Sequence, residues 1–415
     1  MELLRNAVRP YAWGSRTAIA QLQGREVPTP HPEAELWMGA HPDDPSRVIG
    51  PDGAERSLIE ILDADPVGML GEKCAERWDN RLPFLLKVLA ADEPMSMQAH
   101  PSVEQALAGF EREEAAGIPR TASRRNYPDP TAKPELVCAL TEFHVLAGFR
   151  DPHRTVELFK ALDVPSFDRY ASLLAEQPDA DGLRTLFTML ITLPTAVLDE
   201  LLPQVIEACV AHVRAHGPFS LECRTVLELS ELHQGDVGVL AALLLNRLVL
   251  APGEAVYLAA GNLHAYLRGT AVEILANSDN ILRCGLTPKH VDVPELLRVL
   301  DFGHGDMRIL RGEPATPHLL LYPTDAPEFE LSRLEWPEGA ADEDEEDVAI
   351  GHLGPQLLIC TEGAAELYRP DAPPLKLAQG DSAWLPAHDC AEGPVLVHPL
   401  GAGRTQLFRA TAGIL

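Results

Sequence analysis

The stretch GEAVYLAAGNLH, residues 253–264, returns in a second form as GDSAWLPAHDCA, residues 380–391. Each copy opens with a glycine and an acidic residue, and then alternates apolar residues into a turn of small residues. This turn-and-strand texture is typical of jelly-roll barrels, so two copies predict two related β-barrels. A gapless alignment sets His264 against Ala391, which predicts that any chemistry carried by the imidazole belongs to the first copy.

The pattern of apolar and turn-forming residues changes along the chain around these two copies. The first 150 residues are short apolar runs divided by Pro, Gly and Asp, which indicates strands and tight loops more than long helices. From Asp151 to about Leu250, segments such as DGLRTLFTMLITL have apolar residues at i, i+3, i+4 and i+7, as amphipathic helices do. TPKHVDVPELLRVLDF predicts one more short helix, and QLLICTEGAAELY and SAWLPA predict late strands. We therefore predict a mainly β fold with a helical insertion.

Composition limits the class of partner. The formal net charge is −28 over 415 residues, which argues against nucleic acid or an anionic membrane surface, because phosphate groups need a positive field. Seven cysteines without regular spacing predict no disulfide framework. The N-terminus has no long apolar core of a signal peptide, and no run is apolar enough for a membrane helix. A reduced, cytoplasmic protein is the simplest expectation. The acidic run 342–347 predicts a solvated loop.

The stretch MSMQAHPS, residues 95–102, carries the first candidate metal ligands. Residues i and i+2 of a strand point the same way, so Ser96, Gln98 and His100 are expected on one face, which is either a polar pocket or an ordinary wet face. Glu135 in AKPELVCAL and His264 in GNLHAY add a carboxylate and a second imidazole. Two imidazoles and one carboxylate are a common catalytic zinc set, although no compact signature links these residues.

Cations accompany these candidate ligands in an otherwise acidic chain. Lys87 precedes Gln98, Lys133 precedes Glu135, and Arg283 and Lys289 follow His264 in SDNILRCGLTPK. Four such cations suit an anionic ligand such as a phosphate, and the alternative is scattered solvated charge. Asp279 and Glu273 from the same region are expected to be general bases or salt-bridge partners.

At these residues the sequence resembles the type I phosphomannose isomerases. The resemblance runs from YAWGS through PEAELWMGAHPDDPS, LPFLLKVL and MSMQAHPS to KPELVCALTEFHVLAGFR, and resumes in GNLHAYLRGTAVEILANSDNILRCGLTPKHVDVPELL. It implies a catalytic cupin domain formed by residues 1–150 and 251–312, a helical insertion over 151–250, and a metal-free cupin-like barrel over 313–415. Tyr11 to Ser15 and Glu35 to His41 would be structural parts of the catalytic barrel.

The resemblance also implies the site. One Zn²⁺ would be bound by Gln98, His100, Glu135 and His264. The sugar-phosphate pocket would be lined by Ser96, Lys87, Lys133, Arg283 and Lys289, with Tyr266 nearby. One departure is sharp, because the family usually has Asn-His before KPE where this chain has Thr131 and Ala132. If that histidine takes part in proton transfer, another group must replace it here.

The implied reaction is the interconversion of mannose 6-phosphate and fructose 6-phosphate through an enediolate. Arg283 is expected to stabilise the enediolate charge, with Lys133 second. The base stays open among Asp279, a lysine of lowered pKa and a water on the metal. Two alternatives are a non-catalytic bicupin that binds a sugar phosphate, which Ala132 favours, and an iron-dependent cupin oxygenase, which the glutamine and the cations fit poorly. A monomer is expected.

Overall fold

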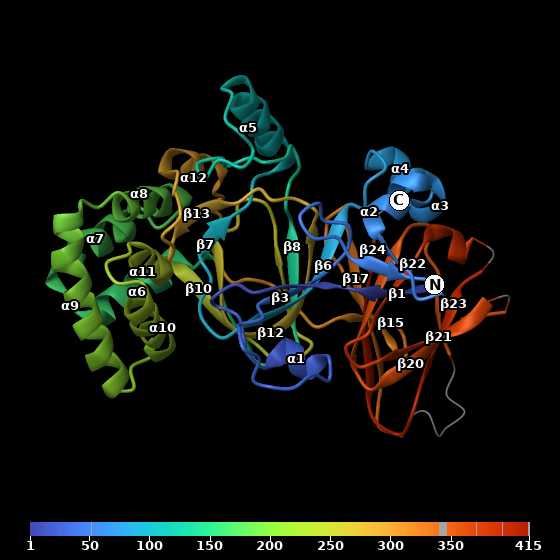
Figure 1. The fold of residues 1–415 in the computed structure, drawn as a ribbon. Coiled ribbons are helices and arrows are strands. Elements are labelled where there is room, and N and C mark those ends of the chain that lie inside the picture. The colour runs from blue at the N-terminus through green and yellow to red at the C-terminus, as the bar shows by residue number, and fades with distance from the viewer. Residues whose placement is uncertain (51, 340–346, 371, 392, 414–415) are drawn as a thin grey trace.

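The protein forms three regions in a row, seen here in a computed structural model (Figure 1). The structure describes all residues except 51, 340–346, 371, 392 and 414–415. A bundle of helices lies at one end, two packed sheets from the C-terminal part lie at the other, and a large sheet stands between them. The predicted mainly β fold with a helical insertion is confirmed. Most of the predicted acidic loop, 342–346, lies outside the described residues.

The central eleven-stranded sheet contains the predicted site. Its main path is β14-β11-β8-β12-β6-β3-β2, while β7, β9, β10 and β13 join through the first half of β12. The bounds are β2 Ala7–Arg9, β3 Glu35–Met38, β6 Phe84–Ala91, β7 Met97–Ala99, β8 Glu135–Ala139, β9 Phe143–Phe149, β10 Leu245–Leu250, β11 Ala255–Leu258, β12 His264–Ala276, β13 Leu282–Gly285 and β14 Ile309–Leu310. Among the described residues these pairings trace an open sheet, and no closed ring of strands is formed.

The C-terminal part forms two further sheets. The nine-stranded sheet follows β15-β16-β17-β24-β19-β22-β1-β4-β5, so three short strands from the first sixty residues complete it, and the four-stranded sheet follows β18-β23-β20-β21. The bounds are β1 Glu2–Arg5, β4 Arg47–Ile49, β5 Glu55–Ser57, β15 Glu313–Thr316, β16 Leu319–Tyr322, β17 Glu330–Trp336, β18 Val348–Ile350, β19 Gln356–Glu362, β20 Ala364–Arg369, β21 Ala372–Ala378, β22 Ser382–Leu385, β23 Val395–Pro399 and β24 Thr405–Thr411.

The two copies seen in the sequence are the same structural unit. Gly253 and Gly380 both adopt a positive φ, 84° and 89°, which favours glycine. The acid that follows each glycine accepts a hydrogen bond from the backbone N–H three residues earlier, at 3.0 Å for Glu254 and 2.9 Å for Asp381. A strand follows at once in both cases, β11 and β22. The predicted repeat is therefore confirmed as far as the strand.

The gapless alignment does not hold beyond these strands. His264 begins β12, whereas Ala391 is exposed and follows the short helix η4, Ala387–Cys390. Matching the two Gly-acid turns gives an offset of 127 residues (380 − 253). The strand register, however, makes Arg409 the equivalent of Glu273, at an offset of 136 (409 − 273). The second copy contains extra chain between its strands, so Ala391 is not the equivalent of His264.

The helices correct the sequence prediction at two places. The insertion is formed as expected by α6 Pro152–Leu162, η1 Pro165–Phe167, α7 Asp168–Glu176, α8 Ala180–Ile191, α9 Thr195–Arg214, α10 Ser220–Leu232, α11 Gly238–Ala241 and η2 Ala242–Leu244, with α12 Val293–Val299 later. Helical structure ends at Leu244, because the apolar run to Leu250 is strand β10 paired with β9. The first 150 residues also hold helices, namely α1 Ala18–Leu22, α2 Leu58–Ala64, α3 Pro66–Leu70, α4 Glu72–Arg77 and the long α5 Val103–Ala115.

The helix α5 starts directly after the first candidate ligands. Ser102 is its N-cap, and the Ser102 hydroxyl and the Gln105 side chain exchange hydrogen bonds with each other's backbone N–H groups in a capping box. Ser102 with Gln105 three residues later is the sequence signature of such a start, so this helix could have been predicted. The strand β7 ends at Ala99, two residues before Pro101.

Two apolar layers hold the central sheet in place. Leu86, Leu136 and Ile274 pack with Trp384 and Phe408 of the nine-stranded sheet in one continuous buried cluster. On the other side, the helices of the insertion share a buried cluster with residues of β7 and β13 such as Met97, Ala99, Leu282 and Cys284. The strands that carry the candidate ligands are therefore fixed from both sides. Among the described residues no single helix meets the length and hydropathy of a membrane span, and α8 and α9 do so only as a pair bent by 107°.

Gly269 lies in β12 where the pairing partner of the strand changes from β9 to β6. We expect Gly269→Ala to lower the free energy of unfolding by about 2–4 kcal/mol, because its φ is +118° and a Cβ would lie 2.5 Å from the Glu142 carbonyl oxygen. Urea denaturation measures the loss. Gly305→Ala is the matched control, since its φ is +124° but its Cβ would meet open space. Equal losses in the two variants would contradict the steric part of this prediction.

Candidate metal centre and surrounding pocket

Three predicted ligands meet in the interior of the central sheet. His100 lies just after β7, Glu135 opens β8 and His264 opens β12, and all three side chains are buried. His100 Nε2 lies 3.2 Å from Glu135 Oε1, and His264 Nε2 lies 3.4 Å from Glu135 Oε2. One ligand atom from each residue falls within 4.8 Å of the others. Residues 164 positions apart (264 − 100) thus converge because β7 and β8 both pair with β12.

The orientation of both imidazoles is fixed from outside the cluster. His100 Nδ1 is 2.7 Å from the backbone oxygen of Asn280, and His264 Nδ1 is 3.0 Å from that of Asn262. Each Nδ1 must donate to its carbonyl, so in the neutral ring the Nε2 atom carries the lone pair and faces Glu135. Both Nε2 atoms are buried and have no hydrogen-bond partner among the described residues. Two free imidazole nitrogens facing a carboxylate fit a zinc ion.

The electrostatics of the cluster also suit a cation. Burial lowers the pKa of His100 to about 4, so the ring is neutral at physiological pH and its nitrogen is free to coordinate. Burial alone would raise the pKa of Glu135, but His100 and the Lys133 ammonium hold it well below its usual range. The carboxylate is thus ionised in the interior, where only a positive partner makes its burial favourable.

Gln98 lies beside this cluster. It pairs in register with His264 on β12 and with Arg283 on β13, and it is 9% exposed. The strand β7 covers only Met97–Ala99. Of the three residues expected on one strand face, Gln98 lies in the strand, and Ser96 and His100 lie immediately before and after it. Arg283 is half-buried, and burial lowers its pKa.

Two buried lysines flank the carboxylates. Lys133 Nζ lies 3.4 Å from Glu135 Oε1, while Lys87 Nζ lies 3.4 Å from Glu35 Oε2 and 3.5 Å from Glu273 Oε2. Burial would lower the pKa of Lys87, but Glu35 and Glu273 raise it overall, so Lys87 stays protonated. Burial, followed by the charge of Glu135, raises the pKa of Glu273 to about 7.

Tyr266 and Asp279 complete the surroundings. The Tyr266 hydroxyl donates to Glu135 Oε2 at 3.3 Å and is buried. Asp279 Oδ1 lies 3.3 Å from His41 Nε2, and this contact lowers the pKa of Asp279. Because His41 Nδ1 accepts from the backbone N–H of Asp43, the proton of the neutral ring is on Nε2 and points at Asp279. The Asp279 side chain is about half exposed, at 52%.

Comparison with known proteins agrees with this geometry. The family model for the catalytic domain of type I phosphomannose isomerase matches residues 1–152. Mannose-6-phosphate isomerase of Escherichia coli (strain K12) is 38% identical over 405 residues, which cover 97% of this chain and 98% of the relative. The chain belongs to the type I phosphomannose isomerase family. The human mannose-6-phosphate isomerase is 33% identical over 355 residues, covering 80% of this chain and 81% of the relative.

Solved structures of phosphomannose isomerases are similar over the whole chain. A structure described as mannose 6-phosphate isomerase in a holo, zinc-bound state aligns with a TM-score of 0.87 and 35% identity, covering 100% of this chain and 99% of that one. A mutant of phosphomannose isomerase from Salmonella typhimurium aligns with a TM-score of 0.88 and 36% identity, covering all of both chains. The similarity therefore includes the helical insertion and the C-terminal sheets as well as the catalytic region.

The family motif SDN has a structural reason in this chain. Ser278 Oγ and the backbone N–H of Asp279 both donate to the Asp129 carboxylate, at 2.9 Å and 2.8 Å. The Asn280 side chain donates to the backbone oxygen of Thr131 at 2.7 Å, while its own backbone oxygen orients His100. The segment before KPE is thereby attached to the ligand loop. Ala132, where the resemblance leads us to expect a histidine, is buried and precedes Lys133 in the chain.

Two predicted pocket residues have weaker contacts with the centre. Ser96 is half-buried and Lys289 is exposed, although partial desolvation, followed by the charge of Arg283, lowers the pKa of Lys289. Glu35 and His41 were expected to be structural, yet Glu35 pairs with Lys87 and His41 holds Asp279. Polar residues in the buried strand ELWM and in the loop after it were the available signal.

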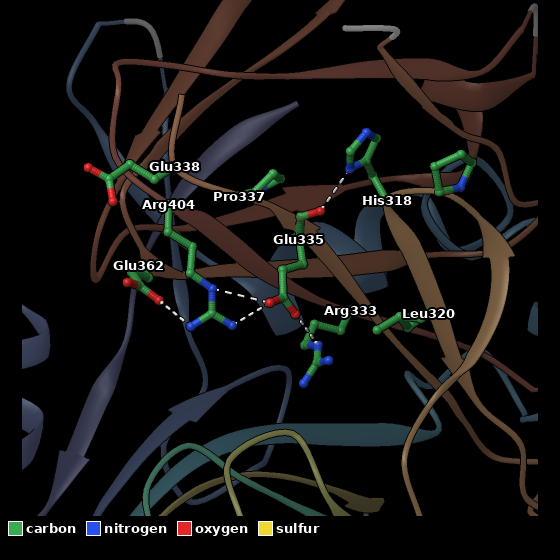
Figure 2. Close-up of a pocket in the computed structure, with 9 residues that line it drawn as sticks. His318, Leu320, Arg333, Glu335, Pro337, Glu338, Glu362 and Arg404 are labelled. Atoms are coloured by element: carbon green, nitrogen blue, oxygen red, sulfur yellow. Dashed lines mark hydrogen bonds and ion pairs between the residues drawn. The ribbon is translucent and has the colours of Figure 1, made fainter. Parts of the chain in front are cut away.

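A separate hollow lies on the C-terminal sheet (Figure 2). It has a volume of about 840 Å³ and is lined mainly by charged residues. Arg404 Nη1 lies 3.1 Å from Glu362, Arg404 also pairs with Glu335, and Arg333 lies 3.0 Å from Glu335. These charges neutralise one another, and none of the predicted site residues lines this hollow. It therefore does not compete with the metal centre as the catalytic site.

Proposed function

We propose that this chain interconverts mannose 6-phosphate and fructose 6-phosphate at the His100, Glu135 and His264 centre, with one zinc ion per chain. The carrying observation is the pair of buried Nε2 atoms without hydrogen-bond partners that face an ionised carboxylate. Gln98 is the proposed fourth ligand, because it is the neighbour of His264 in the sheet. Membership of the family and the zinc-bound relative support this assignment.

The reaction moves a proton from C2 of the open-chain aldose to C1 and a second proton from the C2 hydroxyl to the C1 oxygen, and it passes through a negatively charged enediolate. Bound zinc supplies electrophilic polarisation of the oxygens close to it. We assign stabilisation of the developing charge to Arg283, with Lys133 as second cation, because preorganised positive charge in a dry site lowers the barrier. Lys87, Lys289, Ser96 and Tyr266 are the proposed substrate-binding residues.

Asp279 is the proposed base. Its contact with His41 keeps the carboxylate ionised, and its side chain reaches solvent where a substrate can enter. Lys87 is a poor alternative, because its raised pKa keeps it protonated. Ala132 stands where the resemblance leads us to expect a histidine. We propose that His41, which contacts Asp279, supplies an imidazole near Lys133 and Lys87 in its place.

The proposed domain division agrees with a catalytic site in the central sheet. We propose a discontinuous catalytic domain of residues 1–150 and 251–312, a helical insertion of 151–250 and a C-terminal unit of 313–415. The long strand β12, which joins the strands of the catalytic sheet, favours these bounds. The apolar cluster of the insertion also includes residues of β7 and β13, and β1, β4 and β5 extend the C-terminal sheet. A cytoplasmic monomer stays a prediction, and light scattering on the purified protein tests the oligomeric state.

A coupled assay with mannose 6-phosphate tests the proposed activity, with zinc measured on the same sample. We expect turnover with about one zinc per chain, loss of turnover after complete chelation, and recovery on addition of Zn²⁺. Turnover that survives complete metal removal would exclude the metal role. Tight binding of mannose 6-phosphate without turnover would favour the non-catalytic alternative, and iron in place of zinc would favour the oxygenase.

A further inference from the structure

The helical insertion contacts the loop that carries Lys289. Helix α11 of the insertion lies against strand β13 of the central sheet. Leu286 follows β13 directly, is buried, and shares one apolar cluster with Val239 and Leu240 of α11. The loop 286–289 therefore rests on the insertion just before it presents its lysine.

Two glycines bring the backbones of the insertion and the loop into contact. A Cβ on Gly238, the first residue of α11, would lie 2.9 Å from the backbone nitrogen of Leu286. A Cβ on Gly285, the last residue of β13, would lie 2.8 Å from the Cα of Gly238. Neither position could carry a side chain without displacing backbone atoms, so the insertion has a defined position against the end of β13.

Asp236 of the insertion connects the two segments by hydrogen bonds. Its Oδ1 accepts from the backbone N–H of Gly238 at 2.7 Å, and its Oδ2 accepts from the backbone N–H of Thr287 at 3.3 Å. The Thr287 hydroxyl oxygen in turn accepts from the backbone N–H of Lys289 at 3.2 Å. A continuous series of hydrogen bonds thus leads from the insertion to the lysine.

The backbone of this loop adopts a conformation that needs support from its surroundings. The φ of Leu286 is +56°, in the left-handed region that a leucine rarely adopts. Such residues cost free energy and persist where neighbouring groups hold them in place. The buried side chain of Leu286 fixes one side of the loop, and Asp236 binds the next backbone N–H. The Asp236 carboxylate is therefore placed to stabilise this conformation over a relaxed one.

The loop presents a cation without a carboxylate partner. Lys289 is exposed, and no Asp or Glu among the described residues forms an ion pair with it. Partial desolvation, followed by the charge of Arg283, lowers the pKa of Lys289, so the two cations lie in the same region. Two neighbouring cations suit the phosphate group of a substrate.

We propose that Asp236 is a positioning residue, which holds the loop 286–289 so that Lys289 meets the phosphate group of the substrate. This inference rests on the proposed function, because it takes Lys289 as a substrate-binding residue. None of the proposed metal ligands or pocket residues lies within 151–250, so Asp236 gives the insertion a part in substrate binding. Because Asp236 acts through Lys289, its loss weakens binding of the substrate and leaves the chemical step intact.

Steady-state kinetics with mannose 6-phosphate on the zinc-loaded, full-length protein test this role. We expect Asp236→Ala to raise KM at least about fivefold, as a lost binding contact does, and to change kcat less than about twofold. In the double variant with Lys289→Gln, KM should rise no more than about twofold above that of Lys289→Gln alone, because the two residues act as one unit. Asp151→Ala is the matched control, since Asp151 is half-buried, begins the insertion and likewise accepts from two backbone N–H groups.

Each outcome of these kinetics supports or overturns the role of Asp236. An unchanged KM in Asp236→Ala overturns it, as do effects of Asp236→Ala and Lys289→Gln that multiply in the double variant. An equal rise of KM in Asp151→Ala would assign the effect to a loosened insertion and also overturns it. Should Asp236→Ala fail to fold by circular dichroism, Asp236→Asn, which keeps one acceptor oxygen, takes its place in the same comparison.

Binding of inorganic phosphate separates this inference from the proposed function. Isothermal titration calorimetry needs no turnover, and we expect both Asp236→Ala and Lys289→Gln to weaken phosphate binding. A wild type without turnover, whose phosphate binding both variants weaken, would reject the isomerisation and retain the role of Asp236. An active wild type whose phosphate binding neither variant changes would reject the role of Asp236 and retain the isomerisation.

Discussion

Glu135→Gln is expected to remove zinc from the protein and to lower kcat/KM by at least about 100-fold. Residues that only orient a metal ligand are already worth about 10- to 100-fold, and Glu135 lies between both imidazoles. The amide keeps the shape of the side chain but removes the negative charge, so His100, His264 and Lys133 would surround a neutral group. Metal content by plasma mass spectrometry and turnover with mannose 6-phosphate are measured together.

The control for this variant is another buried glutamate away from the centre. Glu328 is 6% exposed and its Oε2 has no hydrogen-bond partner among the described residues, so Glu328→Gln removes a comparable charge without touching the ligands. We expect it to retain zinc and turnover. Zinc content near one per chain in Glu135→Gln would show that this carboxylate is not a ligand, and full loss in both variants would point to general destabilisation.

The candidate ligands could be named from the sequence as separate polar residues in short motifs, but only the family resemblance joined them into one proposed set. Gln98 lies in the buried strand β7 and His100 follows that strand directly, while Glu135 and His264 each open an apolar strand. What the sequence could not show is that three of them converge, since this follows from the long strand β12 pairing with both β7 and β8. Family resemblance supplied that step, and the structure supplies its physical reason.

The groups around the ligands were harder to predict. Glu35 reaches Lys87 only because β3 lies next to β6, and His41 reaches Asp279 across 238 positions (279 − 41). A polar residue in a buried strand marks Glu35, but the partner in neither contact can be identified from spacing along the chain. The same limit applies to the second copy of the repeat, where the gapless alignment misplaced Ala391. Strand register, which sequence spacing does not reveal, identifies Gln356 and Arg409 as the interior residues of that unit.

Arg283→Gln is expected to lower kcat for isomerisation by about 10²- to 10³-fold, because removal of one preorganised donor to a transition-state anion typically costs that much. Arg283 pairs in register with Gln98, which places it on the strand beside the proposed ligands. Burial already lowers its pKa, so its charge is only partly screened by water and acts strongly on a nearby enediolate. Steady-state kinetics with mannose 6-phosphate give kcat and KM separately.

The split between kcat and KM distinguishes charge stabilisation from phosphate binding. Lys289→Gln is expected to raise KM with little change in kcat, because Lys289 is exposed and proposed to hold the phosphate. Arg247→Gln is the matched arginine control, since burial also lowers the pKa of Arg247 but it lies on β10, hydrogen-bonded to Thr225. Arg283→Lys should recover part of the lost turnover by restoring the charge. If Arg283→Gln raises KM and leaves kcat intact, Arg283 binds the phosphate group, and stabilisation of the enediolate belongs to Lys133.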